Sequence, residues 1–561
     1  MREITGSQML VEALHLEDVK VVFGYPGGAA LNIYDEIYKQ KYFKHILVRH
    51  EQAAVVAADG YARATGEVGV AVVTSGPGIT NALTGIATAY MDSIPVVIIS
   101  GQVSSNLIGT DAFQEIDAIG MSRPCVKHNF LVKNIKEIPK VLKEAFYIAK
   151  SGRPGPVHVD VAKDVTAAKG VFKYPSSINM LTYKPNYKGH AGQIKKAVDM
   201  ILNSQRPLFY LGGGAVSSNA SEDIRELVKL TNIPAVETVM ALGILSCEDK
   251  NLIKMAGMHG SYAANMALSE CDLLICLGAR FDDRITGNTK EFAKHATIIH
   301  VDIDPSSISK IIRAHYPIVG DIKSVVTDLI NELKQNKMKN YKEWHSTIKT
   351  YDKLHPLSYK DSNETIKPQW VIEESAKILG DNTIISTDVG QHQMWVAQFY
   401  PFKEPRRLLT SGGLGTMGYG FPAAIGAKAA FKDVNVVNFS GDGSILMNIQ
   451  ELATANEYGI PVINIVLNNG FLGMVRQWQS MFYEERFSST DLKNLSPDFV
   501  KLAEAFGGKG YRCESKEEFK KALKDAIKSK KVAIIDVVVD RFEDVLPMVP
   551  AGGAIYNMIL E

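Results

Sequence analysis

Asp442 and Asn469 are the residues of this sequence best suited to hold a metal ion. One carboxylate oxygen and one amide oxygen suit a hard cation such as Mg²⁺, which keeps its other coordination positions for water and phosphate. Glycines flank Asp442 and allow the backbone to approach a ligand closely, and the amides that open a following helix can donate to a diphosphate. We therefore predict a diphosphate site bridged by Mg²⁺. The alternative is an ordinary turn in which Asp442 caps a helix.

The segments around these two residues have to bring them together. Residues 434–440 predict a short buried strand, residues 445–459 a helix of about four turns, and residues 462–469 a second buried strand. Strand, helix and strand in this order make a right-handed crossover, which places the carboxyl ends of both strands at one edge of a parallel sheet. Asp442 and Asn469 should therefore meet at that edge, although 27 positions separate them.

The sequence GDG, followed after about thirty residues by NN, resembles the motif of enzymes that use thiamine diphosphate. Beyond this motif, much of the chain resembles the catalytic subunit of the acetohydroxyacid synthases (acetolactate synthases). The resemblance implies that Asp442, Asn469 and the backbone carbonyl of Phe471 bind Mg²⁺, and that Met417 wedges under a bent cofactor. It assigns the following residues to thiamine diphosphate: Glu51, Gly390, Gln391, His392, Gly415, Met417, Asp442, Gly443, Ser444, Asn469 and Met474.

Length and composition are those of an ordinary globular enzyme. With 561 residues, 46% apolar and 22% charged, the chain is long enough for three or four domains. The net charge of +1 gives no reason to expect nucleic acid or an anionic membrane as a partner. Five cysteines without a ligand pattern favour reduced thiols in a cytoplasmic protein. We expect no membrane span and no signal segment, because the first residues predict an amphipathic helix.

Short apolar strands alternate with helices, which predicts an α/β fold of three domains with parallel sheets, at residues 1–165, 190–340 and 368–561. Residues 165–192 are polar and broken by proline and glycine, as in a linker. The Lys-rich residues 334–368 predict a solvated connector with a short helix. The resemblance implies that the three domains bind the pyrimidine of the cofactor, FAD and the diphosphate, the last with a C-terminal tail that closes over the site.

The first domain contains a segment similar to the metal segment. Ser75-Gly76-Pro77-Gly78 matches Ser440-Gly441-Asp442-Gly443, and Ile94-Pro95-Val96 matches Ile460-Pro461-Val462. The same strand-turn-helix-strand unit is therefore predicted twice, with Pro77 in place of the metal carboxylate. A chance match of two glycine turns is the alternative, since such units recur in unrelated folds.

Glu51 follows the predicted strand HILVRH and precedes a helix rich in alanine and valine. A carboxylate at this place can simply stabilise a helix N-terminus. Within RHEQAA, however, Glu51 resembles the activating glutamate of thiamine enzymes, whose hydrogen bond to the aminopyrimidine favours the imino tautomer that removes the thiazolium proton. The resemblance also implies catalytic roles for Gln114, as a donor to an oxyanion, and for Lys163, as a cation at the mouth of the site.

Other phrases resemble substrate contacts of the same family. Gly28 and Ala29 in GYPGGA and Phe113 in GTDAFQE would lie near the substrate, although Phe113 could equally be a core residue. Arg284 in RFDDR matches an arginine that binds the carboxylate of the second 2-oxo acid; a surface ion pair with a neighbouring aspartate is the alternative. Val475 and Trp478 would shape the acceptor pocket.

For the middle domain, the pattern alone only suggests a nucleotide site, because its triple glycine turn lacks the last glycine of GxGxxG. The resemblance implies FAD. The matching residues are Arg153, Gly213, Gly214, Met258, His259, Gly260, Arg280, Asp302 and Asp321.

Taken with the resemblance, these residues predict an enzyme that decarboxylates pyruvate on thiamine diphosphate and ligates the hydroxyethyl unit to pyruvate or 2-oxobutanoate. This reaction begins branched-chain amino-acid biosynthesis. The resemblance further implies a homodimer or tetramer, a structural FAD and a possible small regulatory subunit. The alternatives are an FAD-dependent pyruvate oxidase, another thiamine-dependent 2-oxo acid decarboxylase or carboligase, and a nucleotide-binding scaffold without turnover.

Overall fold

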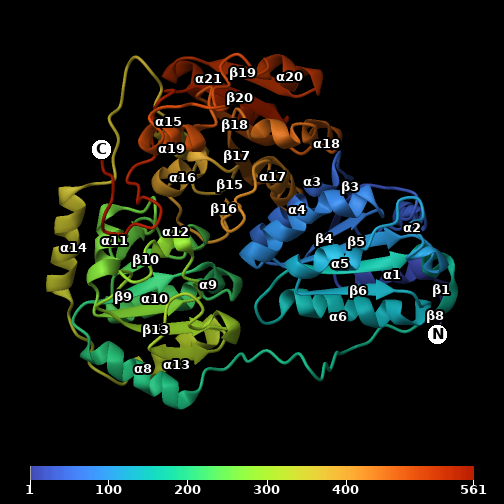
Figure 1. Ribbon diagram of the computed structural model, residues 1–561, viewed down its shortest axis with the longest axis horizontal. Helices are drawn as coiled ribbons and strands as arrows, with labels where there is room; N and C mark the ends of the chain where they lie inside the picture. The colour runs from blue at the N-terminus through green and yellow to red at the C-terminus, as the bar shows by residue number, and fades with distance from the viewer. Residues whose placement is uncertain (1) are drawn as a thin grey trace. The chain divides into compact units, whose positions relative to one another are not determined.

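Three six-stranded sheets organise the chain, whose computed structural model describes residues 2–561 (Figure 1). The first sheet has the order β3-β2-β4-β5-β7-β6, with every neighbouring pair parallel. Its strands are β2 (Val21–Gly24), β3 (Lys44–Leu47), β4 (Gly69–Val73), β5 (Val96–Gln102), β6 (His128–Val132) and β7 (Val157–Ala162). Its helices are α1 (Gly6–Leu16), α2 (Leu31–Lys39), α3 (Glu51–Thr65), α4 (Pro77–Asp92), α5 (Ala118–Ser122), α6 (Ile138–Lys150) and α7 (Lys163–Ala167). As in other parallel sheets, the central strands β4, β5 and β7 are buried along their whole length.

The last sheet has the order β16-β15-β17-β18-β20-β19. Its strands are β15 (Thr383–Thr387), β16 (Leu408–Leu409), β17 (Asn435–Gly441), β18 (Val462–Asn468), β19 (Lys509–Cys513) and β20 (Ala533–Val538). Its helices are α16 (Gln391–Phe399), α17 (Gly420–Ala430), α18 (Glu451–Glu457), α19 (Gly473–Phe482), α20 (Phe499–Ala505) and α21 (Lys516–Ser529). Adjacent parallel strands β17 and β18 confirm the strand pair predicted around Asp442 and Asn469.

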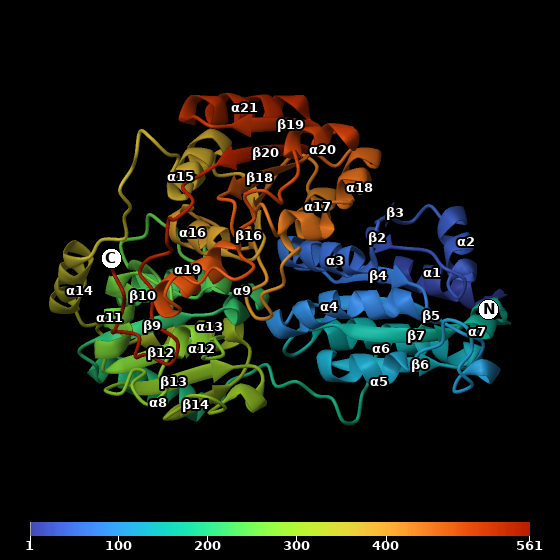
Figure 2. The ribbon, with the colours of Figure 1, turned by 45° about the horizontal axis from the view of Figure 1, so that its top comes forward.

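The first and last sheets belong to one compact unit, formed by residues up to Tyr183, 382–392 and 409–539. Helices α3 and α17 lie side by side in this unit (Figures 1 and 2). Glycine makes this approach possible, because a Cβ atom on Gly60 would lie 2.6 Å from Ala423 Cα. The two helices share a hydrophobic core that draws on both sheets.

The central sheet lies in a second unit, formed by residues 184–381, 393–408 and 540–561. Its parallel strands have the order β11-β10-β9-β12-β13-β14. They are β9 (Pro207–Leu211), β10 (Ala235–Glu237), β11 (Leu252–Met255), β12 (Leu273–Leu277), β13 (Thr297–Asp302) and β14 (Tyr316–Val319). The helices of this unit are α8 (Ala191–Asn203), α9 (Gly213–Ser217), α10 (Ser221–Thr231), α11 (Tyr262–Glu270), α12 (Asp283–Thr286), α13 (Ile322–Leu333), α14 (Lys342–Leu354) and α15 (Pro368–Leu379). The predicted α/β fold with three parallel sheets is therefore confirmed.

The predicted repeat has a structural counterpart. Strands β4 and β5 are parallel neighbours joined through α4, as β17 and β18 are joined through α18. Helix α4 begins at Pro77, directly after Gly76 with φ +58°. Proline is well suited to the first turn of a helix, where no N–H bond is lost. In the first copy, the residue that corresponds to Asp442 is therefore Pro77, which begins a helix.

Four local predictions were wrong. The chain does not pass straight into a helix, because β1 (Arg2–Thr5) precedes α1 and pairs antiparallel with β8 (Lys169–Phe172) in the predicted linker. The four-turn helix after Ser444 is a 3₁₀ turn (Ile445–Asn448) followed by the short α18; Asn448, a weak helix former, instead donates to Gly418 O at 2.7 Å.

The fourth wrong prediction concerns the connector, residues 334–368. Its helix α14 is not only a solvated helix, because one face packs on the central core. Tyr341, Trp344 and Ile348 form an apolar stripe at helical spacing and are buried in the central core. Trp344 Nε1 also donates to Pro207 O at 3.0 Å. The many lysines of this segment hid the stripe. Within residues 2–561, no helix combines the length and the apolar character needed to cross a bilayer.

Candidate functional site

Asp442 and Asn469 follow the ends of two adjacent strands. The register pairs Gly441 with Leu467, so the two residues lie one and two positions beyond that pair. Both are buried, and Ser496 Oγ lies 3.3 Å from an Asp442 oxygen. Asn469 Oδ1 accepts from Phe471 N at 3.0 Å, which turns the chain back toward the same edge. The topology thus brings together the three residues expected to bind Mg²⁺.

Gly443 and Ser444 form the turn after Asp442. Ser444 Oγ accepts from Gly441 N at 3.1 Å and lies 3.0 Å from Ser440 Oγ, which fixes the turn internally. A Cβ atom on Gly443 would lie 2.8 Å from Leu472. At Gly443, glycine is therefore favoured because a side chain would collide with Leu472, which packs against this part of the turn.

Gly390, Gln391 and His392 lie at the end of β15, on the neighbouring strand of the same sheet. Gln391 Oε1 accepts from Asn469 Nδ2 at 3.2 Å, and Gln391 Nε2 donates to the buried Gln477 at 2.9 Å. Gly390 has φ +154°, and a Cβ atom there would lie 2.7 Å from the His392 ring. This close packing explains why glycine precedes the pair.

His392 provides a direct test of whether this edge fits a diphosphate. Burial lowers the pKa of His392 to about 3, so the ring is neutral, and Nε2 has no hydrogen-bond partner among the described residues. A Cβ atom on Gly441 would lie 3.3 Å from the same ring, so the space beside it is left open by glycine. An anion placed there would raise the pKa of His392 and let Nε2 donate. The residues at this edge therefore fit an anionic group.

Met417 lies in a glycine-rich loop whose backbone is fixed from several sides. Gly415 has φ +69°, and Met417 is half-buried. Gly418 N donates to Asp388 at 2.7 Å. Burial raises the pKa of Asp388 to about 6, although several backbone amides partly offset the shift. These bonds hold the loop that the resemblance places under the cofactor.

Glu51 is the first residue of α3, at the end of β3 in the first sheet, and its exposed fraction is 9%. Its carboxylate accepts from Asn81 Nδ2 on α4 at 3.0 Å. Within residues 2–561, no hydrogen bond of Glu51 reaches Met417 or Asp442. The strand-end position predicted for Glu51 is confirmed, whereas its catalytic role remains a prediction.

The other predicted substrate residues of the first domain lie in loops that follow the carboxyl ends of β2 and β5. Gln114 has φ +58°, and a Cβ atom on Gly76 would lie 2.9 Å from Gln114 O, so the two turns pack closely. Phe113 is 89% exposed, which contradicts the reading as a core residue. Gly28 is exposed with open space around it, whereas Ala29 is buried.

Lys163 and Arg153 lie at opposite ends of β7. Lys163 is exposed at the start of α7, as a solvated cation would be. Arg153 precedes the strand, and its Nε donates to Ser93 Oγ at 2.8 Å. Arg153 belongs to the first compact unit, unlike the other residues assigned to FAD.

In the central sheet, the glycines follow the end of β9. Helix α9 begins at Gly213, and a Cβ atom on Gly214 would lie 2.9 Å from Gly278 after β12. Asp302 ends β13 and accepts from Asp304 N at 2.9 Å, while Asp321 caps α13 through Ser324 N at 3.3 Å. These turns all lie at the carboxyl ends of parallel strands, where nucleotides bind in such folds.

Met258, His259 and Gly260 form a turn after β11. Burial lowers the pKa of His259 to about 4, and its Nδ1 lies 3.2 Å from Pro547 O of the C-terminal tail. Met258 O accepts from Val549 N at 2.8 Å, and Met258 N donates to Arg284 O at 2.6 Å. The tail therefore packs on this turn, within the second unit.

Arg280 and Arg284 differ in their surroundings. Arg280 Nη2 donates to Asp282 at 3.2 Å, in a half-buried pair. The side chain of Arg284 is 59% exposed, and its Nε lies 3.9 Å from Asp283. Such an exposed, loose pair contributes little stability and leaves the guanidinium accessible.

Trp478 and its neighbours lie on α19, directly after the loop that contains Asn469 and Phe471. Met474 and Trp478 are half-buried and Val475 is 51% exposed, so part of this face is open. The Trp478 and Phe482 rings are 5.7 Å apart in an edge-on arrangement. Met474, Val475 and Trp478 lie within about one turn of this helix.

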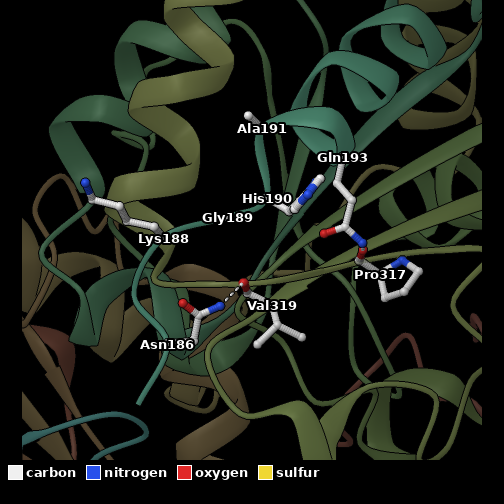
Figure 3. Close-up of a pocket in the computed structure, with 8 residues that line it drawn as sticks. All are labelled: Asn186, Lys188, Gly189, His190, Ala191, Gln193, Pro317 and Val319. Atoms are coloured by element: carbon white, nitrogen blue, oxygen red, sulfur yellow. Dashed lines mark hydrogen bonds between the residues drawn. The ribbon is translucent and has the colours of Figure 1, made fainter. Parts of the chain in front are cut away.

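A separate pocket of about 530 Å³ lies beside the edge strand β14 (Figure 3). It is lined by Asn186, Lys188, Gly189, His190, Ala191, Gln193, Pro317 and Val319. Asn186 Nδ2 donates to Val319 O at 3.2 Å, which ties the linker to the sheet. None of the predicted site residues lines it. Among the described residues, no cluster of three His, Cys, Asp or Glu side chains could hold a metal.

Sequence reasoning missed residues whose hydrogen bonds hold the predicted site residues or their loops in place. These are Asn81, Thr88, Asp388, Asn448, Glu451, Gln477 and Ser496. Apart from Asp388, whose strand end precedes Gly390, none carries a local signal, because their roles depend on contacts between distant segments.

Comparison with known proteins identifies the family. Three family models match: the N-terminal TPP binding domain of thiamine pyrophosphate enzymes at residues 4–121, the central domain at 194–329 and the C-terminal TPP binding domain at 388–537. The chain is 48% identical to the acetolactate synthase large subunit of Haemophilus influenzae, covering 100% of this chain and 99% of that one. The chain belongs to the acetolactate synthase large subunits.

Further members are similarly close. The isozyme 3 large subunit of Escherichia coli is 48% identical over 100% of this chain and 99% of its own length. The probable acetolactate synthase large subunit of Methanocaldococcus jannaschii is 49% identical over 99% of this chain and 95% of its own length. Similarity that runs the whole length in bacteria and an archaeon confirms the predicted family, and with it a thiamine diphosphate-dependent enzyme.

Proposed function

We propose that this chain decarboxylates pyruvate and joins the two-carbon unit to a second 2-oxo acid, pyruvate or 2-oxobutanoate, in the first shared step of branched-chain amino-acid synthesis. The full-length similarity to acetolactate synthase large subunits carries this proposal. Thiamine diphosphate supplies the electron sink for this chemistry.

We further propose that Mg²⁺ binds to Asp442, Asn469 and the carbonyl of Phe471. The supporting observations are the adjacent strand ends and the burial of both side chains. His392, Gly390 and Gln391, together with Gly443 and Ser444, would receive the diphosphate. Met417, in its fixed loop, and Gly415 would support the ring system, and Met474 would flank it.

Glu51 would move the proton that activates the cofactor, with Asn81 orienting its carboxylate. Gln114 and Lys163 would act on the substrate, and Gly28, Ala29 and Phe113 would line its site. Arg284 offers an exposed guanidinium for the carboxylate of the second acid, and Val475 and Trp478 offer an apolar face beside it.

FAD would bind at the turns of the central sheet, through the nine residues named for it, from Arg153 to Asp321. The close packing of Gly214 on Gly278 supports a backbone that a nucleotide can approach. Since the net reaction transfers no electrons, this flavin would be structural. The three domains would span residues 1–165, 190–340 and 368–561.

The proposed assembly is a homodimer or tetramer with sites between subunits, as the resemblance to thiamine enzymes implies. An 89% exposed Phe113 also favours a further partner surface. The relatives are named large subunits, which supports a separate small regulatory subunit. Five free cysteines support a cytoplasmic location.

One product analysis tests this function. The protein is incubated with pyruvate and 2-oxobutanoate, with and without thiamine diphosphate and Mg²⁺. Release of CO₂ together with 2-acetolactate and 2-aceto-2-hydroxybutanoate, dependent on both additions, supports the proposal. Flavin bleaching by pyruvate without either carboligation product would instead indicate an oxidase, and no CO₂ at all would indicate a non-catalytic scaffold.

A further inference from the structure

The position of Glu51 depends on the four residues before it. Leu47 ends β3, and His50, with an extended backbone, is the N-cap of α3. His50 Nδ1 accepts from Gln52 N at 3.2 Å, which starts the helix. Because Glu51 is the first helical residue, any shift of this connection moves its carboxylate directly.

Side chains on α18 and at its C-cap, in the last domain, bind the backbone of this connection. Both carboxylate oxygens of Glu451 accept from Arg49 N, at 3.0 and 3.2 Å. Thr454 Oγ1 lies 3.3 Å from Leu47 O, and Leu47 N donates to Tyr458 OH at 3.0 Å. Glu451, Thr454 and Tyr458, on one side of this segment, therefore hold the end of β3 and the residues directly after it.

Glu451 is fully buried, with an exposed fraction of 0%, as is Thr454. Its carboxylate also accepts from Thr454 Oγ1 at 2.7 Å, within its own helix. Burying a carboxyl group is costly unless donors satisfy it, and the backbone amides of Arg49 and His50 stabilise this carboxylate from outside the helix. Removing the carboxylate would leave the part-buried N–H of Arg49 without this acceptor.

A nearby pair provides a contrast. Arg49 Nη2 binds Glu457 Oε2 at 2.6 Å, but the Glu457 side chain is 53% exposed. This bond involves the side chain of Arg49 rather than the backbone, and solvent screens it. Glu457 therefore contacts Arg49 without fixing the position of its backbone.

We propose that Glu451 is a positioning residue for activation of the cofactor. By binding the amide of Arg49, Glu451 fixes the start of α3, and with it the position of the Glu51 carboxylate that would act on the cofactor. This inference rests on the role proposed above for Glu51. Glu451 lies nine residues after Asp442, the proposed metal ligand, in the sequence.

The first readout needs no cofactor. Amide hydrogen exchange is followed by mass spectrometry on peptides that cover residues 44–54 in the protein free of thiamine diphosphate. In Glu451→Ala, exchange at residues 47–51 should be about tenfold faster or more, because the amides lose their anchor. Peptides of β17 and β18 should match the wild type, and so should every peptide of the matched control Glu457→Gln.

The second readout is the rate at which the C2 proton of bound thiamine diphosphate exchanges with D₂O at saturating cofactor. Glu451→Ala should slow it about tenfold or more, Glu451→Gln should slow it less because one acceptor oxygen remains, and Glu457→Gln should not change it. Should Glu451→Ala not fold, Glu451→Gln decides: slowing of about threefold supports the proposal.

Glu51→Gln separates the two levels of the inference. If Glu51→Gln slows C2 exchange and the Glu451 variants do not, the positioning role is wrong while the role of Glu51 stands. If Glu51→Gln leaves the rate unchanged, the proposed role of Glu51 itself fails, and the positioning role fails with it. Slowing in Glu51→Gln and Glu451→Ala together, with normal exchange in Glu457→Gln, supports both.

Discussion

Thr88 and Thr416 share a hydrogen bond of 2.7 Å between their buried hydroxyl groups. Thr88 lies on α4, which begins at the glycine turn of the first sheet, and Thr416 directly precedes Met417. Thr88 Oγ1 also lies 2.8 Å from Thr84 O. The loop expected to support the cofactor is therefore fixed by a helix of another domain.

Thr416→Val should weaken cofactor binding. The substitution keeps the shape but removes a bond worth about 1 kcal/mol, so the Kd for thiamine diphosphate should rise about fivefold. Fluorescence titration of the protein measures this Kd. Thr231→Val is a suitable control, because Thr231 also makes a buried bond, to Leu227 O at 2.8 Å in α10. It should lower Tm but leave the Kd for the cofactor unchanged.

Asn81→Ala should reduce activity through the orientation of Glu51. The Asn81 amide donates to the Glu51 carboxylate at 3.0 Å, and its loss frees the carboxylate to rotate. We expect kcat to fall about tenfold, with little change in the KM for pyruvate. Initial-rate kinetics test this; a rise in KM at constant kcat would contradict an effect on activation.

Asp442→Ala should strongly weaken metal-dependent cofactor binding. The change removes the carboxylate at the predicted Mg²⁺ site, and the affinity for thiamine diphosphate with Mg²⁺ should fall about 100-fold or more. Isothermal titration of chelator-treated protein gives the value. Ser496→Ala removes only the hydroxyl that lies 3.3 Å from Asp442, and its effect should be about tenfold.

Glu237 should make stability fall as the pH rises. Burial raises the pKa of Glu237 from 4.5 to about 8, while bonds from Leu245 N and Gly243 N offset part of the shift. Between those values the folded protein retains a proton that the unfolded chain has released, so stability decreases with increasing pH across this window, by at most about 1.4 kcal/mol per pH unit.

Glu237→Gln removes this titration. The Tm of the variant relative to the wild type should therefore be higher at pH 7.5 than at pH 5.5. Differential scanning at the two pH values measures the change. Glu222→Gln, whose side chain is 82% exposed, is the control and should show the same Tm difference from the wild type at both pH values. A variant that gains nothing at pH 7.5 would show that Glu237 is ionised in the fold.

Periodicity in the sequence was enough to predict the architecture around Asp442 and Asn469. The buried runs ending at Ser440 and Asn469 are long enough and β-branched enough to specify parallel strands, and the crossover rule then brings their ends together. The position of Glu51 at a strand end followed from the same argument.

Contacts between distant segments were not predictable. Glu451 resembles any helix-opening acid in the sequence, and its bond to Arg49 spans 402 positions. The Lys-rich α14 concealed the buried Trp344, because charge on one face obscured an apolar stripe on the other. The pairing of β1 with β8 joins residues 164 to 170 positions apart, from Thr5 with Lys169 to Arg2 with Phe172, which no local pattern indicates.

The most direct test of the account is a crystal structure of the protein with thiamine diphosphate and Mn²⁺ in place of Mg²⁺, with anomalous diffraction used to locate the metal. We predict one anomalous peak per subunit within about 2.2 Å of an oxygen of Asp442 and of Asn469. A fully active enzyme whose anomalous peak lies away from both residues would contradict the assignment of this sheet edge as the metal and diphosphate site.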